Sequence, residues 1–145
     1  MVQLSQEVVT AAQESQRQWK IFASLSLSQY GLESAWGKKM SGKNNPFGIK
    51  ATAAQPGTEV VTHEVNSKGQ RYEVTAKFRD FDSVSDAFSA HAELLATDKR
   101  YANCLNAKTP EDAAQALTGV YATDPNYGDL LVRIIDDSGL RKYDV

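Results

Sequence analysis

The sequence of 145 residues has one cysteine, no long apolar run and no excess of positive charge. Because Cys104 is alone, the chain can form no internal disulfide and no thiolate metal cluster, and we expect Cys104 to be a small buried apolar residue. No apolar stretch reaches the ~18 residues of a membrane-spanning helix, so we expect no stable membrane insertion. A formal net charge of -2 disfavours a nucleic-acid partner. A neutral or weakly charged polymer suits this balance better.

The length and a hydrophobic content of 41% are enough for one good core, so we expect a single domain over residues 1–145. Helical spacing of apolar residues predicts an amphipathic helix within 4–22. Ser83, Thr109 and Asp124 each offer the start signal of a further helix. Between 57 and 81 the pattern alternates around turn residues 66–69, which predicts a β-hairpin. The predicted fold class is α+β: mostly helical, with a small hairpin lobe forming one wall of a cleft.

Glu33 is the one acidic residue in a stretch, 25–50, that breaks from helix formers into a Gly/Asn/Pro loop. We expect its helix to begin at Ser24 or Ser26 and to end at Gly37. An apolar stripe is expected beside it, made of Leu25, Leu32 and Trp36. A carboxyl group held against apolar side chains has its charged form disfavoured, which raises its pKa and suits a general acid. An ordinary helical glutamate is the competing interpretation.

Other chemistry is poorly supported by the sequence. His63 and His91 lack the spacing of a helical zinc motif, and there is no nucleophile elbow or phosphate-binding glycine loop, so we expect no metal and no cofactor. What is left is a pair of carboxylates, which glycosidic bond cleavage commonly uses. Glu64 on the predicted hairpin could face Glu33 across the cleft, or it could be an ordinary solvated strand residue.

Five motifs, in order, resemble the glucosaminidase domains of glycoside hydrolase family 73: SLSQYGLESAWG, GKNNPFGIKA, a β segment ending AKFRDFDSVSDAFSAHAELL, DKRYANCL and VYATDPNYGDLLVRII. That family includes bacterial autolysins, the peptidoglycan-hydrolase domain of flagellar rod assembly and phage lytic enzymes. The likeness covers roughly residues 22–135. It implies a lysozyme-like fold and an endo-β-N-acetylglucosaminidase that hydrolyses the glycan strand of peptidoglycan after N-acetylglucosamine.

The resemblance also implies roles for single residues. The catalytic acid of the family falls on Glu33, and its second carboxylate falls on Glu64, with Glu59 and Glu73 as rivals. The expected substrate-binding residues are Trp36, Asn45, Phe47, Gly48, Tyr121 and Tyr127. One departure is that Tyr30-Gly31 stands where the family commonly has two alanines.

The N-terminus has no basic start followed by an apolar core, so we expect no signal peptide. A protein that acts on the cell wall or periplasm would then leave the cytoplasm by a holin-type route, as a bacteriolytic phage endolysin, or be a virion component. We expect a monomer. The alternatives are a lytic transglycosylase or muramidase on the same strand, or a non-catalytic cell-wall-binding or structural virion module.

Overall fold

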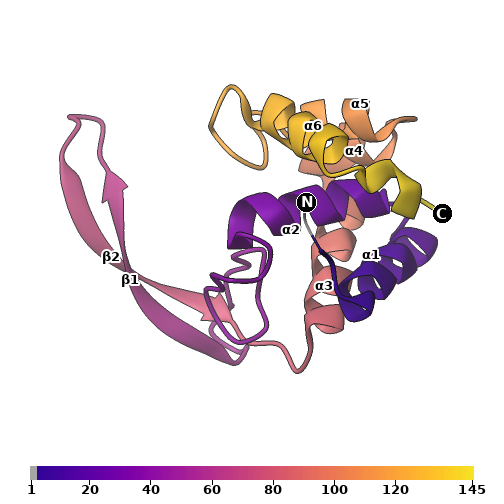
Figure 1. The fold of residues 1–145 in the computed structure, drawn as a ribbon. Helices are drawn as coiled ribbons and strands as arrows, with labels where there is room; N and C mark the ends of the chain where they lie inside the picture. The colour runs from indigo at the N-terminus through magenta and orange to yellow at the C-terminus, as the bar shows by residue number, and fades with distance from the viewer. Residues whose placement is uncertain (1–2) are drawn as a thin grey trace.

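Helices and one β-hairpin, joined by loops, form the fold of residues 3–145, the part of the chain that this computed structural model describes (Figure 1). The long helices are α1 (Gln6–Trp19), α2 (Ala23–Ser34), α3 (Val84–Thr97) and α6 (Tyr127–Asp137). The short ones are α4 (Ala102–Leu105), α5 (Pro110–Gln115) and the 3-10 turns η1 (Lys99–Tyr101) and η2 (Leu140–Tyr143). Strands β1 (Gly57–Val65) and β2 (Arg71–Arg79) form the hairpin. The predicted α+β class is confirmed.

None of the helices within residues 3–145 combines the length and the apolar character that crossing a membrane requires.

Helix α2 lies in the middle of the helical body (Figure 1). All of its residues except Leu32 and Glu33 are buried. It packs against α1, α3, α5 and α6, and it contributes to two clusters of buried side chains, with Leu27 in one and Leu25 in the other. Close packing around the buried part of α2 fixes the helix in place and so positions its last turn, which carries Glu33.

The predicted start of α2 is wrong. The helix begins at Ala23, with Phe22 as its N-cap residue and no capping side chain. Ser24 is already inside the helix, where its hydroxyl donates to the Asp144 carboxylate at 2.8 Å and its backbone N–H donates to the same group at 2.7 Å. The C-terminal segment thus satisfies a backbone donor that a serine cap was expected to satisfy.

The predicted end of α2 is also wrong. The helix stops at Ser34, whose hydroxyl donates to the Tyr30 carbonyl and accepts a hydrogen bond from the Gly37 N–H at 2.8 Å. Ala35, Trp36 and Gly37 then all have positive φ. Leu32 is 36% exposed, so the predicted stripe does not form. The surroundings of Glu33 are supplied by other segments.

Gly31 lies near the end of α2, where Trp36 of the following turn packs back against the helix. A Cβ atom at this position would lie 2.7 Å from ring atoms of Trp36, which packs back over the helix. Alanine normally favours a helix over glycine by about 1 kcal/mol. Trp36 is held by its left-handed backbone and by an edge contact with Tyr30. The cost of overpacking, typically about 1–3 kcal/mol, should therefore exceed the gain in helix propensity.

Gly31→Ala is therefore expected to lower the free energy of unfolding by about 1 kcal/mol or more and to change the tryptophan fluorescence of the folded state. Urea unfolding measures both quantities. In the double variant Gly31→Ala/Trp36→Leu, the alanine should instead be neutral or stabilising relative to Trp36→Leu alone. Stabilisation of the single variant with unchanged fluorescence would show that the ring does not occupy this space.

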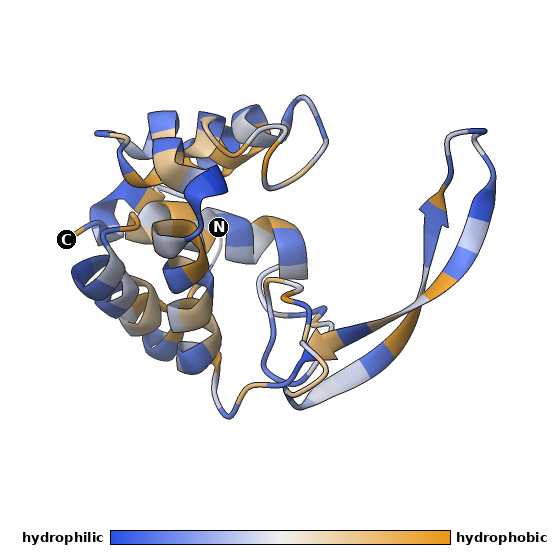
Figure 2. Ribbon diagram, turned by 180° about the vertical axis from the view of Figure 1, so that it is seen from behind, coloured by the Kyte–Doolittle hydropathy of each residue, from blue (hydrophilic) through white to orange (hydrophobic). Residues whose placement is uncertain are grey.

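The hairpin runs from Gly57 to Arg79 and projects from the helical body, as predicted for residues 57–81 (Figure 1). Hydrophilic and hydrophobic residues are mixed along it (Figure 2). Its turn closes through the Gly69 N–H, which donates to the Asn66 carbonyl. An isolated two-stranded hairpin is marginally stable, but the base of this one is tied to the preceding loop, because the Arg79 N–H donates to the Ile49 carbonyl at 2.8 Å.

Two predicted helix caps are confirmed. The Ser83 hydroxyl accepts the Asp86 N–H at the start of α3, and the Thr109 hydroxyl accepts the Asp112 N–H at the start of α5. Helix α6 begins later than Asp124, because the Asp124 carboxylate accepts the Asn126 N–H and forms a turn before the helix. Cys104 is 3% exposed, as predicted.

Candidate active site

Glu33, in the last turn of α2, opens into a pocket of about 470 Å3. The other residues that line it are Phe47, Gly48, Ile49, Lys50, Leu94, Tyr101, Tyr121 and Ala122. They come from the loop before the hairpin, from α3, from η1 and from the loop before α6. The strands themselves do not line this pocket; the wall on the hairpin side is the 47–50 loop, which the base of the hairpin holds in place.

The Glu33 carboxyl group combines exposure with partial desolvation. Glu33 is open to solvent at the mouth of the pocket, yet the surrounding protein displaces enough water to raise the pKa of its carboxyl group above the ordinary value. A hydrogen bond from the Tyr127 hydroxyl, 3.0 Å from Oε1, favours the carboxylate and opposes part of this rise. A substrate that closes the pocket would remove further water and favour the protonated form.

Three hydrogen bonds connect Glu33 to the interior. The His91 Nε2 donates to Gln29 Oε1 at 2.8 Å, Gln29 Nε2 donates to the Tyr127 hydroxyl at 3.0 Å, and that hydroxyl donates to Glu33. His91 and Gln29 are fully buried, and Tyr127 is 3% exposed. Burial, together with the nearby Glu33 charge, raises the pKa of Tyr127, so it stays a donor. In each of these three hydrogen bonds the donor lies on the side away from Glu33, so the series points toward the carboxyl group. We call this series the donor chain.

His91, the first donor of the donor chain, is fully buried. Burial lowers the pKa of its imidazole to about 3, so the ring is neutral at ordinary pH and carries its proton on Nε2. The ring stacks on Phe47, with centroids 4.1 Å apart and planes inclined by 12°. This stacking joins the donor chain to the loop that lines the pocket.

Asn45 holds the 45–49 loop in shape. Its side-chain NH2 donates to the Ile49 and Arg79 carbonyls at 2.8 and 2.9 Å, and its oxygen accepts the Phe47 and Ile49 N–H groups. The side chain is fully buried, and its hydrogen bonds go to the loop and to the end of β2. Gly48, which is exposed with φ +65°, lies at the pocket surface. Asn45 therefore shapes the wall, while Gly48, which has no side chain, leaves the backbone open at the pocket surface.

Tyr121 forms the opposite wall. Its ring stacks on Tyr127 with centroids 5.8 Å apart, and it lies edge-on to His91. Burial, followed by the Glu33 charge, raises the pKa of its hydroxyl, so it too remains protonated. Tyr121 and Tyr127, which come from the motif YATDPNY, thus both lie near Glu33: Tyr121 lines its pocket, and Tyr127 donates a hydrogen bond to it.

Four of the expected site residues do not line the Glu33 pocket: Asn45, Tyr127, Trp36 and Glu64. Asn45 holds the 45–49 loop and Tyr127 reaches Glu33 from the interior, as described above. Trp36 packs on the helical core and is not part of the lining. Glu64 is exposed near the tip of the hairpin, where the Tyr72 hydroxyl donates to it at 3.2 Å. In the strand register Glu64 pairs with Tyr72, on the same face as Phe78, whereas Glu59 and Glu73 lie on the opposite face. Phe78 lies against the preceding loop, near Gly42 and with its ring about 4.0 Å from where a Cβ on Gly48 would be.

Several residues of the site carry no clear sequence signal. Gln29 precedes Glu33 by one helical turn, which places the two on one face, but its contact with His91 spans 62 residues. Lys50, Leu94 and Tyr101 line the pocket through tertiary packing alone. The one hint in the sequence is an amide at position 29 on the helix face of Glu33, because an amide that becomes buried there needs hydrogen-bond partners.

A carboxylic acid at the end of a buried central helix, beside an aromatic pocket and a small β-hairpin, defines a lysozyme-like α+β domain. Residues 9–140 match the family model described as mannosyl-glycoprotein endo-β-N-acetylglucosaminidase. The chain therefore belongs to the glucosaminidase family, glycoside hydrolase family 73. The resemblance identified from its motifs is confirmed.

Relatives and solved structures agree with this membership. The chain is 41% identical over 120 residues to peptidoglycan hydrolase FlgJ of Salmonella typhimurium, covering 77% of the chain and 38% of FlgJ. It is 34% identical over 141 residues to exo-glucosaminidase LytG of Bacillus subtilis, covering 92% of the chain and 50% of LytG. The catalytic domain of the Listeria monocytogenes autolysin Auto matches with a TM-score of 0.84 and 28% identity, over 99% of this chain and 91% of that one. The chain thus spans half or less of these two curated relatives.

Proposed function

We propose that this chain hydrolyses the glycan strand of peptidoglycan at the β-1,4 bond after N-acetylglucosamine, as an endo-β-N-acetylglucosaminidase, with Glu33 as general acid. The observation that carries the proposal is a glutamate with a raised pKa at a pocket, hydrogen-bonded through the donor chain. The name of FlgJ, a peptidoglycan hydrolase, supports the substrate class, and the name of LytG, an exo-glucosaminidase, supports the sugar after which the strand is cut. Tyr121 and Gly48 provide an aromatic face and an open backbone against which a sugar can lie.

The geometry suggests how the proton is placed. Tyr127 donates to Oε1 of Glu33, which leaves Oε2 to hold the acidic proton and present it to the leaving oxygen. As that proton departs, negative charge develops on the carboxylate, and the hydrogen bond from Tyr127 becomes charge-assisted and stronger. Gln29 and His91 position the tyrosine hydroxyl for this role.

Glu64 is our candidate for the second carboxylate, acting as the base that activates water. Its place on the hairpin face that carries Phe78 supports it over Glu59 and Glu73. Glu64→Gln is expected to lower kcat by roughly 100-fold or more, whereas Glu59→Gln on the opposite face should stay near the wild-type rate. Attack by water inverts the anomeric carbon, so proton NMR of fresh product should show inversion. A near-normal rate in Glu64→Gln with a retained anomer would instead point to attack by the substrate's own acetamido group.

Analysis of the digestion products tests the proposed reaction and its alternatives. Mass spectrometry of digested, defined peptidoglycan should show fragments that have gained water, with N-acetylglucosamine at the new reducing end and internal bonds cut. Anhydro sugars would indicate a lytic transglycosylase, and N-acetylmuramic acid at the reducing end a muramidase. Single sugars released only from chain ends would indicate an exo-enzyme. Binding without release of fragments would indicate a wall-binding or virion module.

We also propose the cell wall as the place of action, reached as a phage endolysin or a virion component. If the holin-type route is used, cells that express the chain should lyse only when a holin is co-expressed. Lysis without the holin would contradict this route.

A further inference from the structure

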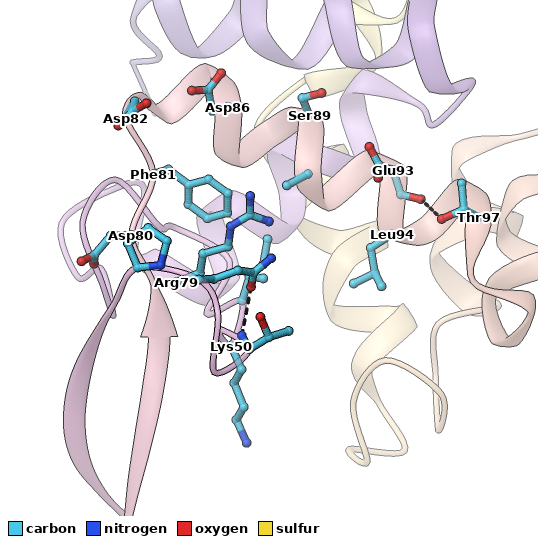
Figure 3. Close-up of a pocket in the computed structure, with 15 residues that line it drawn as sticks. Lys50, Arg79, Asp80, Phe81, Asp82, Asp86, Ser89, Glu93, Leu94 and Thr97 are labelled. Carbon is cyan, nitrogen blue, oxygen red and sulfur yellow. Dashed lines mark hydrogen bonds between the residues drawn. The ribbon is translucent and has the colours of Figure 1, made fainter.

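A second pocket, of about 680 Å3, lies between α3 and the base of the hairpin (Figure 3). We call it the lateral pocket. It adjoins the Glu33 pocket, because Ile49, Lys50 and Leu94 line both. One wall is a face of α3 that includes Asp86 and Glu93. The other wall carries Lys50 and Arg79 together with Asp80 and Asp82. The Asp80 carboxylate accepts hydrogen bonds from the Lys43 N–H and the Thr58 hydroxyl and points away from α3 (Figure 3).

The Arg79 cation reaches toward the acidic face of α3. The Arg79 guanidinium lies over the Phe81 ring, 4.6 Å from its centroid, and reaches toward α3, whereas the Lys50 side chain extends away from α3 (Figure 3). Asp86 and Glu93 are exposed on α3. Within residues 3–145, none of these four side chains forms an ion pair. A pocket that turns the unpaired Arg79 toward the unpaired acids of α3 suits a ligand that carries both kinds of charge.

We propose that the lateral pocket binds the peptide arm of the substrate, with a peptide carboxylate at Arg79 and a free amine at Glu93. This inference rests on the proposed function. Peptidoglycan sugars carry short peptides with free carboxylates and the amine of a diamino acid. The shared residues Lys50 and Leu94 join the lateral pocket to the glycan at Glu33.

Two forms of the same glycan strand test the proposal. One carries its peptides, and the other has been stripped of them by an amidase. On peptide-bearing strands, Arg79→Gln and Glu93→Gln should each lower kcat/KM by roughly 5- to 20-fold. On stripped strands both should stay within about twofold of wild type. Arg133→Gln and Glu14→Gln, which change the same charges at exposed positions outside the pocket, should match wild type on both strands.

The outcomes separate cleanly. Selective loss on peptide-bearing strands in both variants supports the proposal. Equal loss on both strands would overturn it, because the residues would then serve the glycan or the fold. Wild-type rates of both variants on both strands would also overturn it. Glu93 lies on the opposite wall from Arg79, so its variant still decides the matter if Arg79→Gln disturbs Phe81. A wild-type protein that cleaves neither strand would refute the proposed function itself.

Discussion

Glu33→Gln should fold normally and lose hydrolysis of peptidoglycan by roughly 10²- to 10⁴-fold, the range that a general acid contributes. Glutamine keeps the shape of the side chain and can still accept the hydrogen bond from Tyr127, whose hydroxyl lies 3.0 Å from Oε1. It cannot release a proton to the leaving oxygen. The loss should therefore fall on kcat, and the release of reducing ends from purified peptidoglycan measures it.

Two controls define what the loss means. Glu14→Gln, an exposed change on α1, should behave like wild type. Glu33→Asp keeps an acid but draws it away from Tyr127, so it should retain more activity than Glu33→Gln. If Glu33→Gln has the circular dichroism spectrum of the wild type and also its rate, Glu33 is not the acid.

The second large effect is a pH-dependent loss of stability centred on His91. Its imidazole has a pKa of about 3 in the folded protein, against an ordinary value of 6.5. Above pH 6.5 the ring is neutral in both states. As pH falls from 6.5 toward 3, the unfolded chain binds a proton that the folded chain does not, so the free energy of unfolding falls. The contribution of this one group should amount to about 3 kcal/mol by pH 4.

One variant, compared with the wild type, isolates that contribution from that of the carboxylates. His91→Gln can still donate to Gln29 but does not titrate. It should be less stable than wild type at pH 7, and its deficit should shrink by about 3 kcal/mol at pH 4. The wild-type protein, measured at the same pH values, is the reference. Urea unfolding at both pH values measures the differences, and a constant deficit for His91→Gln would mean that His91 is not a buried neutral group.

Features that depend on local chemistry could be predicted from the sequence. The Ser83 and Thr109 caps and the 66–69 turn depend on neighbouring residues, and each is found as expected. The ends of α2 could not be predicted, because Asp144, 120 residues away, takes over the role of a cap at Ser24. Tyr121 and Tyr127 could be expected near Glu33 only from the family motif, not from local chemistry.

The support behind Glu33 could not be predicted from the sequence either. The desolvated environment of the carboxyl group was expected from an apolar stripe that includes Leu32, yet Leu32 is exposed. The pocket lining comes from residues distant in the sequence, such as Leu94 and Tyr121. The donor chain joins Gln29 to His91 across the core, and no local pattern encodes that contact.

The most direct test of Glu33 as proton donor compares two leaving groups. A nitrophenyl glycoside of a short N-acetylglucosamine oligomer releases a phenolate that needs no proton, whereas the glycan strand releases a sugar alcohol that does. Glu33→Gln should cleave the aryl glycoside within about tenfold of wild type and the glycan at least roughly 100-fold more slowly. An equal loss on both substrates, or no loss on either, would contradict the assignment of Glu33 as the general acid.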